Sequence, residues 1–303
     1  MGKASRRARQ TERRQSTTVP PAPFVARPFA GIPGETDLVA MREIVPAATA
    51  TLALRADAPA LVEAAGEEPV PRTVTVATVL PLAMPGLHRG DGARVLGLQS
   101  TSTSGDPSRD LAHALLHVLA APAGTPVRPS TVADSATPRL QDLIDPDQPL
   151  DVQVHDSFDF WIAPGADVDD QTAAQLAETN ESIVPTVKLA GVESAYWCRV
   201  GDRTHLRWLL PQDEDRATDA LARLVASGEE SLGAGTRLLG AFRACGLLAP
   251  VWDLDPALEA GDYEEAMVAQ ARRFDEALAV DGPLGLDERR ARAGLLSRQL
   301  TLR

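Results

Sequence analysis

Apolar and polar residues alternate in short runs in both halves of the chain, which is the pattern of strands with one buried face. The clearest run is 73–80, where threonine and valine alternate ahead of Pro81. In the second half, Gly201-Asp202 separates two such runs and is a dipeptide typical of a tight hairpin. Strands are therefore expected at 49–54, 73–80, 94–99, the start of 151–162, 195–200 and 204–210.

Other segments have apolar residues three and four positions apart, the spacing of an amphipathic helix. Asp106-Pro107 places an N-cap residue and a first-turn proline ahead of an apolar stripe that ends at Leu119. Asp213 opens an acid-rich segment that suits a helix N-terminus, and Leu221 lies on the apolar face that follows. Helices are expected from 106 and from 213, and at 167–183, about 235–246, 262–281 and 287–303.

The order of these elements predicts an α+β protein of two lobes with a helical C-terminal region. Residues 73–120 and 194–227 share one order, in which a strand, a turn, a second strand and a helix follow each other. A duplicated unit would explain this order, and so would chance, because a hairpin followed by a helix is common. The expected parts are a tail and proline-rich linker at 1–28, a first lobe at 29–162 and a second lobe at 163–303.

Charge sets the N-terminus apart from the rest of the chain. The first fifteen residues hold one acid, Glu12, and the remaining 288 residues hold 24 basic and 41 acidic side chains. The chain therefore joins a tail of net charge +5 to a body of −17, which gives the overall −12. Residues 1–18, called the basic tail below, are polar and aperiodic, so we expect them to be disordered and to bind a polyanion. The basic residues of the tail are Lys3, Arg6, Arg7, Arg9, Arg13 and Arg14.

Composition excludes several classes of protein. No run of eighteen apolar residues is present, so no membrane span is expected. The arginines of the tail lead into a polar, proline-rich stretch without the apolar core of a signal peptide. The two cysteines, Cys198 and Cys245, are too few for a disulfide framework or a four-cysteine zinc site. We expect a cytoplasmic protein without a metal or another cofactor.

One cluster of polar residues is a candidate for acid–base chemistry. His155, Asp156 and Asp159 lie close together in the sequence, and such groups can move protons when their pKa values are shifted. The neighbouring Phe158 and Phe160 favour a different interpretation, in which a strand packs its aromatic side into the core. This cluster remains the candidate polar site of the chain.

Two further patterns allow a ligand and also a purely structural explanation. Asp110, His113 and His117 share one helical face, and two histidines four apart can hold a metal. Their position opposite the apolar stripe favours a solvated polar face instead. The tryptophans of the second half, Trp197, Trp208 and Trp252, would suit a binding groove, although a place in the core is more common for this residue.

Several segments resemble an uncharacterised family of actinobacterial proteins that is defined only as a domain of unknown function. The segments that carry the resemblance include RPFAGIPGETDLVAMREIVPAATA (27–50), VHDSFDFWI (154–162), AYWCRVGDRTHLRWLLPQDED (195–215) and LLGAFRACGLLAPVWDL (238–254). Some members of that family carry a label that relates them to the SecA preprotein translocase. The resemblance implies no catalytic residues.

A translocase motor would need a phosphate-binding loop of the pattern G-x-x-x-x-G-K-[ST]. The only lysines are Lys3 and Lys188, and neither follows such a glycine pattern. The nearest glycine-rich stretch, 233–240, lacks the lysine. The sequence therefore predicts that the protein is not a P-loop ATPase.

Taken together, the sequence predicts a non-enzymatic cytoplasmic binding or adaptor protein. Its basic tail would dock on a polyanion, with ribosomal or other structured RNA as the first partner to test and an anionic membrane surface as the competitor. The acidic body would meet a protein partner or keep the complex soluble. Two alternatives stay open: a small-molecule enzyme that uses the His155, Asp156 and Asp159 region, and a secretion-associated chaperone or adaptor.

Overall fold

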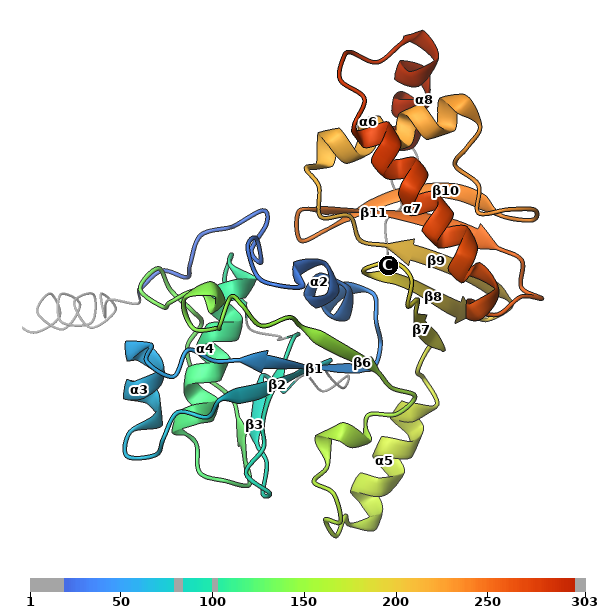
Figure 1. Cartoon of the computed structure of the whole chain (residues 1–303). Helices are drawn as coiled ribbons and strands as arrows, with labels where there is room; N and C mark the ends of the chain where they lie inside the picture. The colour runs from blue at the N-terminus through green and yellow to red at the C-terminus, as the bar shows by residue number, and fades with distance from the viewer. Residues whose placement is uncertain (1–18, 79–83, 100–102, 298–303) are drawn as a thin grey trace, which may run out of the picture.

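Two β-sheets and the helices around them form the protein, as the computed structural model shows for residues 19–78, 84–99 and 103–297 (Figure 1). The α+β class predicted from the sequence is confirmed. The basic tail lies outside the described residues. The first sheet has six strands: β1 (Ala48–Ala53), β2 (Thr73–Ala77), β3 (Gly86–His88), β4 (Arg94–Gly97), β5 (Thr125–Val127) and β6 (Asp151–Val154). The second has five: β7 (Thr186–Lys188), β8 (Ala195–Val200), β9 (Arg203–Trp208), β10 (Arg237–Ala244) and β11 (Leu247–Leu254).

The described helices flank and join these sheets (Figure 1). The α-helices are α2 (Glu35–Glu43), α3 (Pro59–Ala65), α4 (Pro107–Ala120), α5 (Asp170–Asn180), α6 (Glu214–Ser227), α7 (Glu264–Leu278) and α8 (Leu286–Ser297). The 3₁₀ helices are η1 (Leu140–Asp142), η2 (Asp159–Trp161) and η3 (Ala260–Tyr263).

The first sheet is mixed, with strand order β5–β3–β4–β2–β1–β6. Strands β2 and β4, which the sequence predicted, pair in parallel, and the short β3 between them in the chain pairs antiparallel with β4. The unit of hairpin and helix in this lobe is therefore β3–β4–α4, with its turn at Arg89–Gly92. Asp106 caps α4 by accepting a hydrogen bond from the backbone N–H of Ser108, as its position in the sequence predicted.

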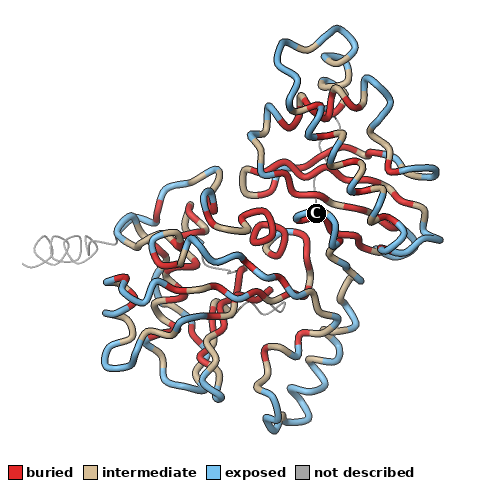
Figure 2. The backbone as a smooth tube through the Cα atoms, in the orientation of Figure 1, coloured by how far each residue is buried: buried red, intermediate tan, exposed pale blue. Residues whose placement is uncertain are grey.

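The second sheet is antiparallel throughout and has the order β10–β11–β9–β8–β7. Its hairpin β8–β9 turns at Gly201-Asp202, as predicted, and Trp197 pairs with Leu206 across it. Both faces of this sheet are buried, because Trp197 packs in a core with α6 and α7 while its neighbour Tyr196 packs toward the first lobe (Figure 2). The helix expected from Asp213 is α6, and the side chain of Asp213 caps it.

The helix predicted at about 235–246 is wrong, because these residues form strand β10. Strands β10 and β11 make a hairpin that turns at Cys245-Gly246, where Gly246 has a φ of +80°. A Cβ atom on Gly246 would lie 2.6 Å from the carbonyl oxygen of Ala26, so glycine is needed there. Seven of the eight residues of β11 are buried. A strand buried on both faces lacks the alternation of apolar and polar residues by which a strand is recognised in a sequence.

Helix α2 lies between the two sheets and joins the lobes (Figures 1 and 2). Residues Glu35 to Met41 are all buried, so this helix has almost no solvent-facing side. Its apolar side chains share one core with the first sheet and with one face of the second, including Phe242 and Val251. The two lobes therefore fold against a common helix.

Candidate functional site

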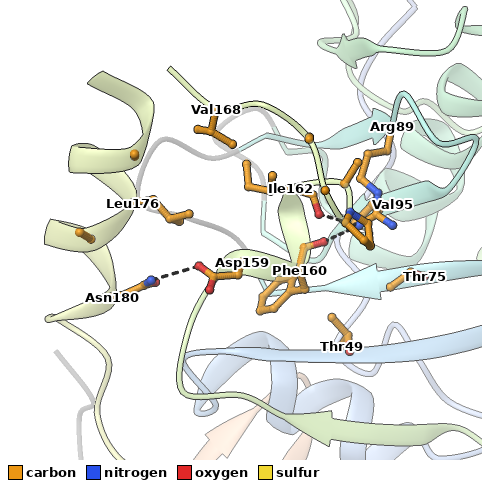
Figure 3. Close-up of a pocket in the computed structure, with 16 residues that line it drawn as sticks. Thr49, Thr75, Arg89, Val95, Asp159, Phe160, Ile162, Val168, Leu176 and Asn180 are labelled. Carbon is orange, nitrogen blue, oxygen red and sulfur yellow. Dashed lines mark hydrogen bonds between the residues drawn. The ribbon is translucent and has the colours of Figure 1, made fainter. Parts of the chain in front are cut away.

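A pocket of about 690 Å³ opens on the outer face of the first sheet (Figure 3). Its floor is formed by Thr49 of β1, Thr75 of β2 and Val95 of β4. Thr75 and Val95 are register partners, so their side chains lie next to each other on this face. The walls come from η2, the loop after it and α5, with Phe160, Ile162, Val168 and Leu176 as the larger apolar groups.

Arg89 fixes the loop that forms one wall. Its Nη1 donates hydrogen bonds to the carbonyl oxygens of Phe160 at 2.9 Å and Ile162 at 3.2 Å (Figure 3). The same guanidinium pairs with Asp91 at 2.7 Å, and these hydrogen bonds lower the pKa of the Asp91 carboxyl. Because its guanidinium N–H groups are bonded to the wall and to Asp91, Arg89 holds the pocket wall in place.

The three candidate residues predicted from the sequence lie at or near this pocket. Asp159 lines it and accepts a hydrogen bond from Asn180 Nδ2 at 3.3 Å (Figure 3). The Nε2 atom of His155 lies 2.8 Å from Thr49 Oγ1, and its ring packs 4.9 Å from that of Phe160. Asp156 is exposed and is not one of the lining residues. His155 and Asp159 thus have different hydrogen-bonding partners, Thr49 and Asn180.

The strand expected to carry the aromatic residues of this segment ends earlier than predicted. Strand β6 stops at Val154, and Asp159–Trp161 form the 3₁₀ helix η2. Phe158 and Trp161 nevertheless enter a core, where they pack against Ala47, Ala77 and Val95 on the outer face of the sheet. Leu176 of α5 and Ile183 pack on the same cluster, so α5 is attached to the first sheet.

The position of His155 predicts a contribution to the pH dependence of stability. Desolvation by burial lowers the pKa of His155, and the nearby Asp156 raises it by less. The folded protein then binds fewer protons than the unfolded chain near pH 6, so stability should fall as pH drops below the unfolded value of about 6.5. Thermal melts of His155→Gln between pH 8 and pH 5 should show a smaller loss of Tm than the unchanged protein. Equal losses in the two proteins would contradict this assignment.

The other polar pattern, on α4, is bonded to the backbone. The rings of His113 and His117 lie 4.4 Å apart, with His113 Nε2 at 3.1 Å from the Thr131 carbonyl oxygen and His117 Nδ1 at 2.9 Å from that of His113. Within residues 19–78, 84–99 and 103–297, no group of three or more histidine, cysteine or acidic side chains is arranged to hold a metal ion.

The tryptophans and the glycine-rich stretch also have structural explanations. Trp197, Trp208 and Trp252 are buried in the core of the second lobe, which agrees with the core interpretation over the groove. The stretch 233–240 leads into strand β10, whereas a phosphate-binding loop leads into a helix N-terminus.

A buried polar cluster between the lobes was not predicted from the sequence. Asp37 of α2 accepts hydrogen bonds from Ser194 Oγ at 2.6 Å and from the Tyr196 hydroxyl at 2.8 Å, and it pairs with Lys188 Nζ at 2.5 Å. Burial, followed by the charge of Asp37, raises the pKa of Tyr196, so its hydroxyl stays protonated and donates. Ser194 has a φ of +56°, a strained conformation for a residue other than glycine. No local pattern could reveal this cluster, because Asp37 is more than 150 positions away in the chain from Lys188, Ser194 and Tyr196.

A family model agrees with the resemblance of the sequence segments. The model of DUF5926, a family of unknown function, matches residues 28–303. The chain belongs to this family. The part shared with DUF5926 contains both sheets, the pocket and the buried polar cluster, and the basic tail precedes it. No curated protein and no solved structure matches this DUF5926 chain.

A helix that crosses a bilayer needs about 20 consecutive, mostly apolar residues. None of the helices within the described ranges is both long and apolar enough to span a membrane.

Proposed function

We propose that this protein is a non-enzymatic cytoplasmic binding or adaptor protein that docks on RNA through its basic tail. The observation that carries the proposal is the separation of charge, with six basic side chains in the first fifteen residues and a net −17 on the rest of the chain. Clustered lysine and arginine bind phosphates and release counterions, which supplies affinity without sequence preference. Ribosomal or other structured RNA is the polyanion that we expect.

The structure supports a tail that is tethered to the body at one point. Pro21 bridges to Asp134, and the Ala22 N–H donates to the Ala133 carbonyl oxygen at 2.9 Å. Backbone hydrogen bonds also link Ala22 and Val25 to Gly105 at 2.8 and 2.9 Å. A Cβ atom on Gly105 would lie 2.3 Å from the Phe24 nitrogen, so this close approach requires glycine. Residues 19–28, the proline-rich linker and called the connector below, are thus bonded to the first lobe and would keep RNA bound by the tail beside the body.

Removal of the tail tests this proposal. Deleting residues 1–18 should abolish cosedimentation with ribosomes or structured RNA and leave Tm nearly unchanged, because the deleted residues precede the anchored connector. Neutralising about five phosphates should give a log–log salt slope of about −3.5 to −4.5.

A full-length variant with all six basic tail residues changed to glutamine is the matched control for tail length, and it should behave like the deletion. Equal RNA retention by either variant and the unchanged protein would refute the proposal. Retention on anionic vesicles but not on RNA would also refute it and assign the tail to a membrane surface.

A further inference from the structure

The negative charge of the body is concentrated in one segment of the chain. Residues 140–187, called the acidic segment below, contain eleven acidic side chains and no lysine or arginine. These 48 residues therefore account for −11 of the net −17 that the body carries. None of the ion pairs found among the described residues uses a carboxylate of the acidic segment. The repulsion within this segment has no internal cation to offset it.

The acidic segment also builds the pocket on the first sheet. Twelve of the sixteen lining residues lie between Asp159 and Asn180 (Figure 3). Seven of the eleven acidic residues lie between Asp156 and Glu181, and all seven are exposed. Helix α5, which forms one wall, has no buried residue. This pocket, called the groove below, is thus lined by both apolar and polar side chains and has exposed carboxylates close to it in the chain.

The chemistry of this groove fits an arginine-rich peptide. A guanidinium pairs with carboxylates through two parallel hydrogen bonds, and its aliphatic stem covers apolar surface. Phe160 offers an aromatic ring in the groove on which a guanidinium can stack. The carboxyl of Asp169 beside the groove has its pKa lowered by hydrogen bonds from Thr172, so it carries its charge at neutral pH.

We propose that this groove is a docking site for the chain's own basic tail. The tail has the complementary charge, +5 against −11, and it is the densest group of basic residues in the sequence. Its connector is bonded to the first lobe, the lobe whose strands form the floor of the groove. An extended chain of 18 residues spans up to about 60 Å, which exceeds the diameter of about 50 Å expected for a globular body of this size.

Tethering favours the intramolecular complex over capture of a foreign basic segment. A short flexible connection gives the tail an effective concentration in the millimolar range, so contacts that are individually weak suffice. A docked tail would be covered by the acidic segment, and RNA would have to displace it. The docking itself does not depend on RNA binding and can be tested in its absence.

Zero-length carbodiimide crosslinking of the full-length protein tests the proposal directly. Lys3 is in the tail, and the other lysine, Lys188, is paired with Asp37 and provides an internal reference. At low ionic strength and without RNA, the monomer should show crosslinks from Lys3 or the N-terminal amine to carboxylates between Asp156 and Glu181. High salt should remove these crosslinks and spare the one between Lys188 and Asp37.

Two pairs of variants separate specific docking from general attraction. Asp159→Asn, Asp167→Asn and Asp170→Asn together should lower the yield of the tail crosslink to the remaining acids by about tenfold. The matched control, with the same charge change, replaces the exposed Asp202, Asp275 and Asp281 of the second lobe by asparagine and should change the yield by less than about twofold.

The second pair tests the groove itself. Ala177→Trp fills the groove and should suppress the crosslink, whereas Ala174→Trp, exposed on the same helix but outside the lining, should not. Tail crosslinks that map to other acids, that occur only in a dimer, or that respond equally to a variant and its control would overturn the proposal. Because the readout contains no RNA, a failure here leaves the RNA proposal to its own test.

Discussion

Replacing Asp37 with alanine should lower the free energy of unfolding by about 3–5 kcal/mol, the cost of leaving buried partners of a charge unpaired. Asp37 is 4% exposed, and its carboxylate is the common acceptor for Lys188, Ser194 and Tyr196. Ser194 and Tyr196 are fully buried, so water cannot replace the lost acceptor. Urea denaturation followed by circular dichroism measures this loss.

Two controls sharpen the Asp37 prediction. Tyr196→Phe removes one hydrogen bond to a charged group and should cost less, about 1.5–3 kcal/mol. Asp57→Ala changes an exposed carboxylate of the same lobe and should cost under about 0.5 kcal/mol. A loss below about 1 kcal/mol for Asp37→Ala would show that the cluster is not what holds α2 to the second sheet.

Truncating Leu221 to alanine should destabilise the protein by about 2–5 kcal/mol. Leu221 is 1% exposed and lies in the core that α6 shares with α7 and the second sheet. The cost includes a cavity, because this core contains tryptophans and other large side chains that cannot collapse freely into the space. The measurement is the shift in the urea midpoint at constant m-value.

The control for Leu221 has to be chosen from the structure. The helical pattern places Arg223 on the outer face of α6, but its guanidinium donates to the carbonyl oxygens of Ala277 and Gly282 at 3.3 and 3.1 Å. Arg216, exposed on the same helix, is the better control, and Arg216→Ala should cost under about 0.5 kcal/mol. If Leu221→Ala and Arg216→Ala had similar effects, the assignment of Leu221 to the core would be wrong.

The candidate site could be predicted from the sequence only in part. The segment with His155, Asp156 and Asp159 was singled out from residue type and spacing, and two of the three lie at the pocket or against its floor. Their partners Thr49 and Asn180 come from distant or separate elements, so no spacing rule connects them to the site. The lack of lysine and arginine between Arg139 and Lys188 was visible in the sequence and is the signal that would have indicated the acidic segment beside the groove.

The sequence by itself determined the elements whose signals lie within a few neighbouring residues of the chain. The capped start of α4 at Asp106, the start of α6 at Asp213 and the hairpin at Gly201-Asp202 depend on caps, turns and periodicity, and all three are confirmed. The family could also be recognised from the sequence, because the segments that carry the resemblance are continuous in the chain.

Tertiary structure decided the elements whose neighbours lie elsewhere in the chain. Residues 237–254 are apolar on both faces, so their period does not distinguish helix from strand, and only their place between α2 and the helices of the second lobe makes them a hairpin. Strand β3 has three residues and is defined by its pairing with β4 and β5. The burial of Asp37 has the same origin, because a charged side chain enters the interior only when the fold brings hydrogen-bonding partners such as Lys188 to it.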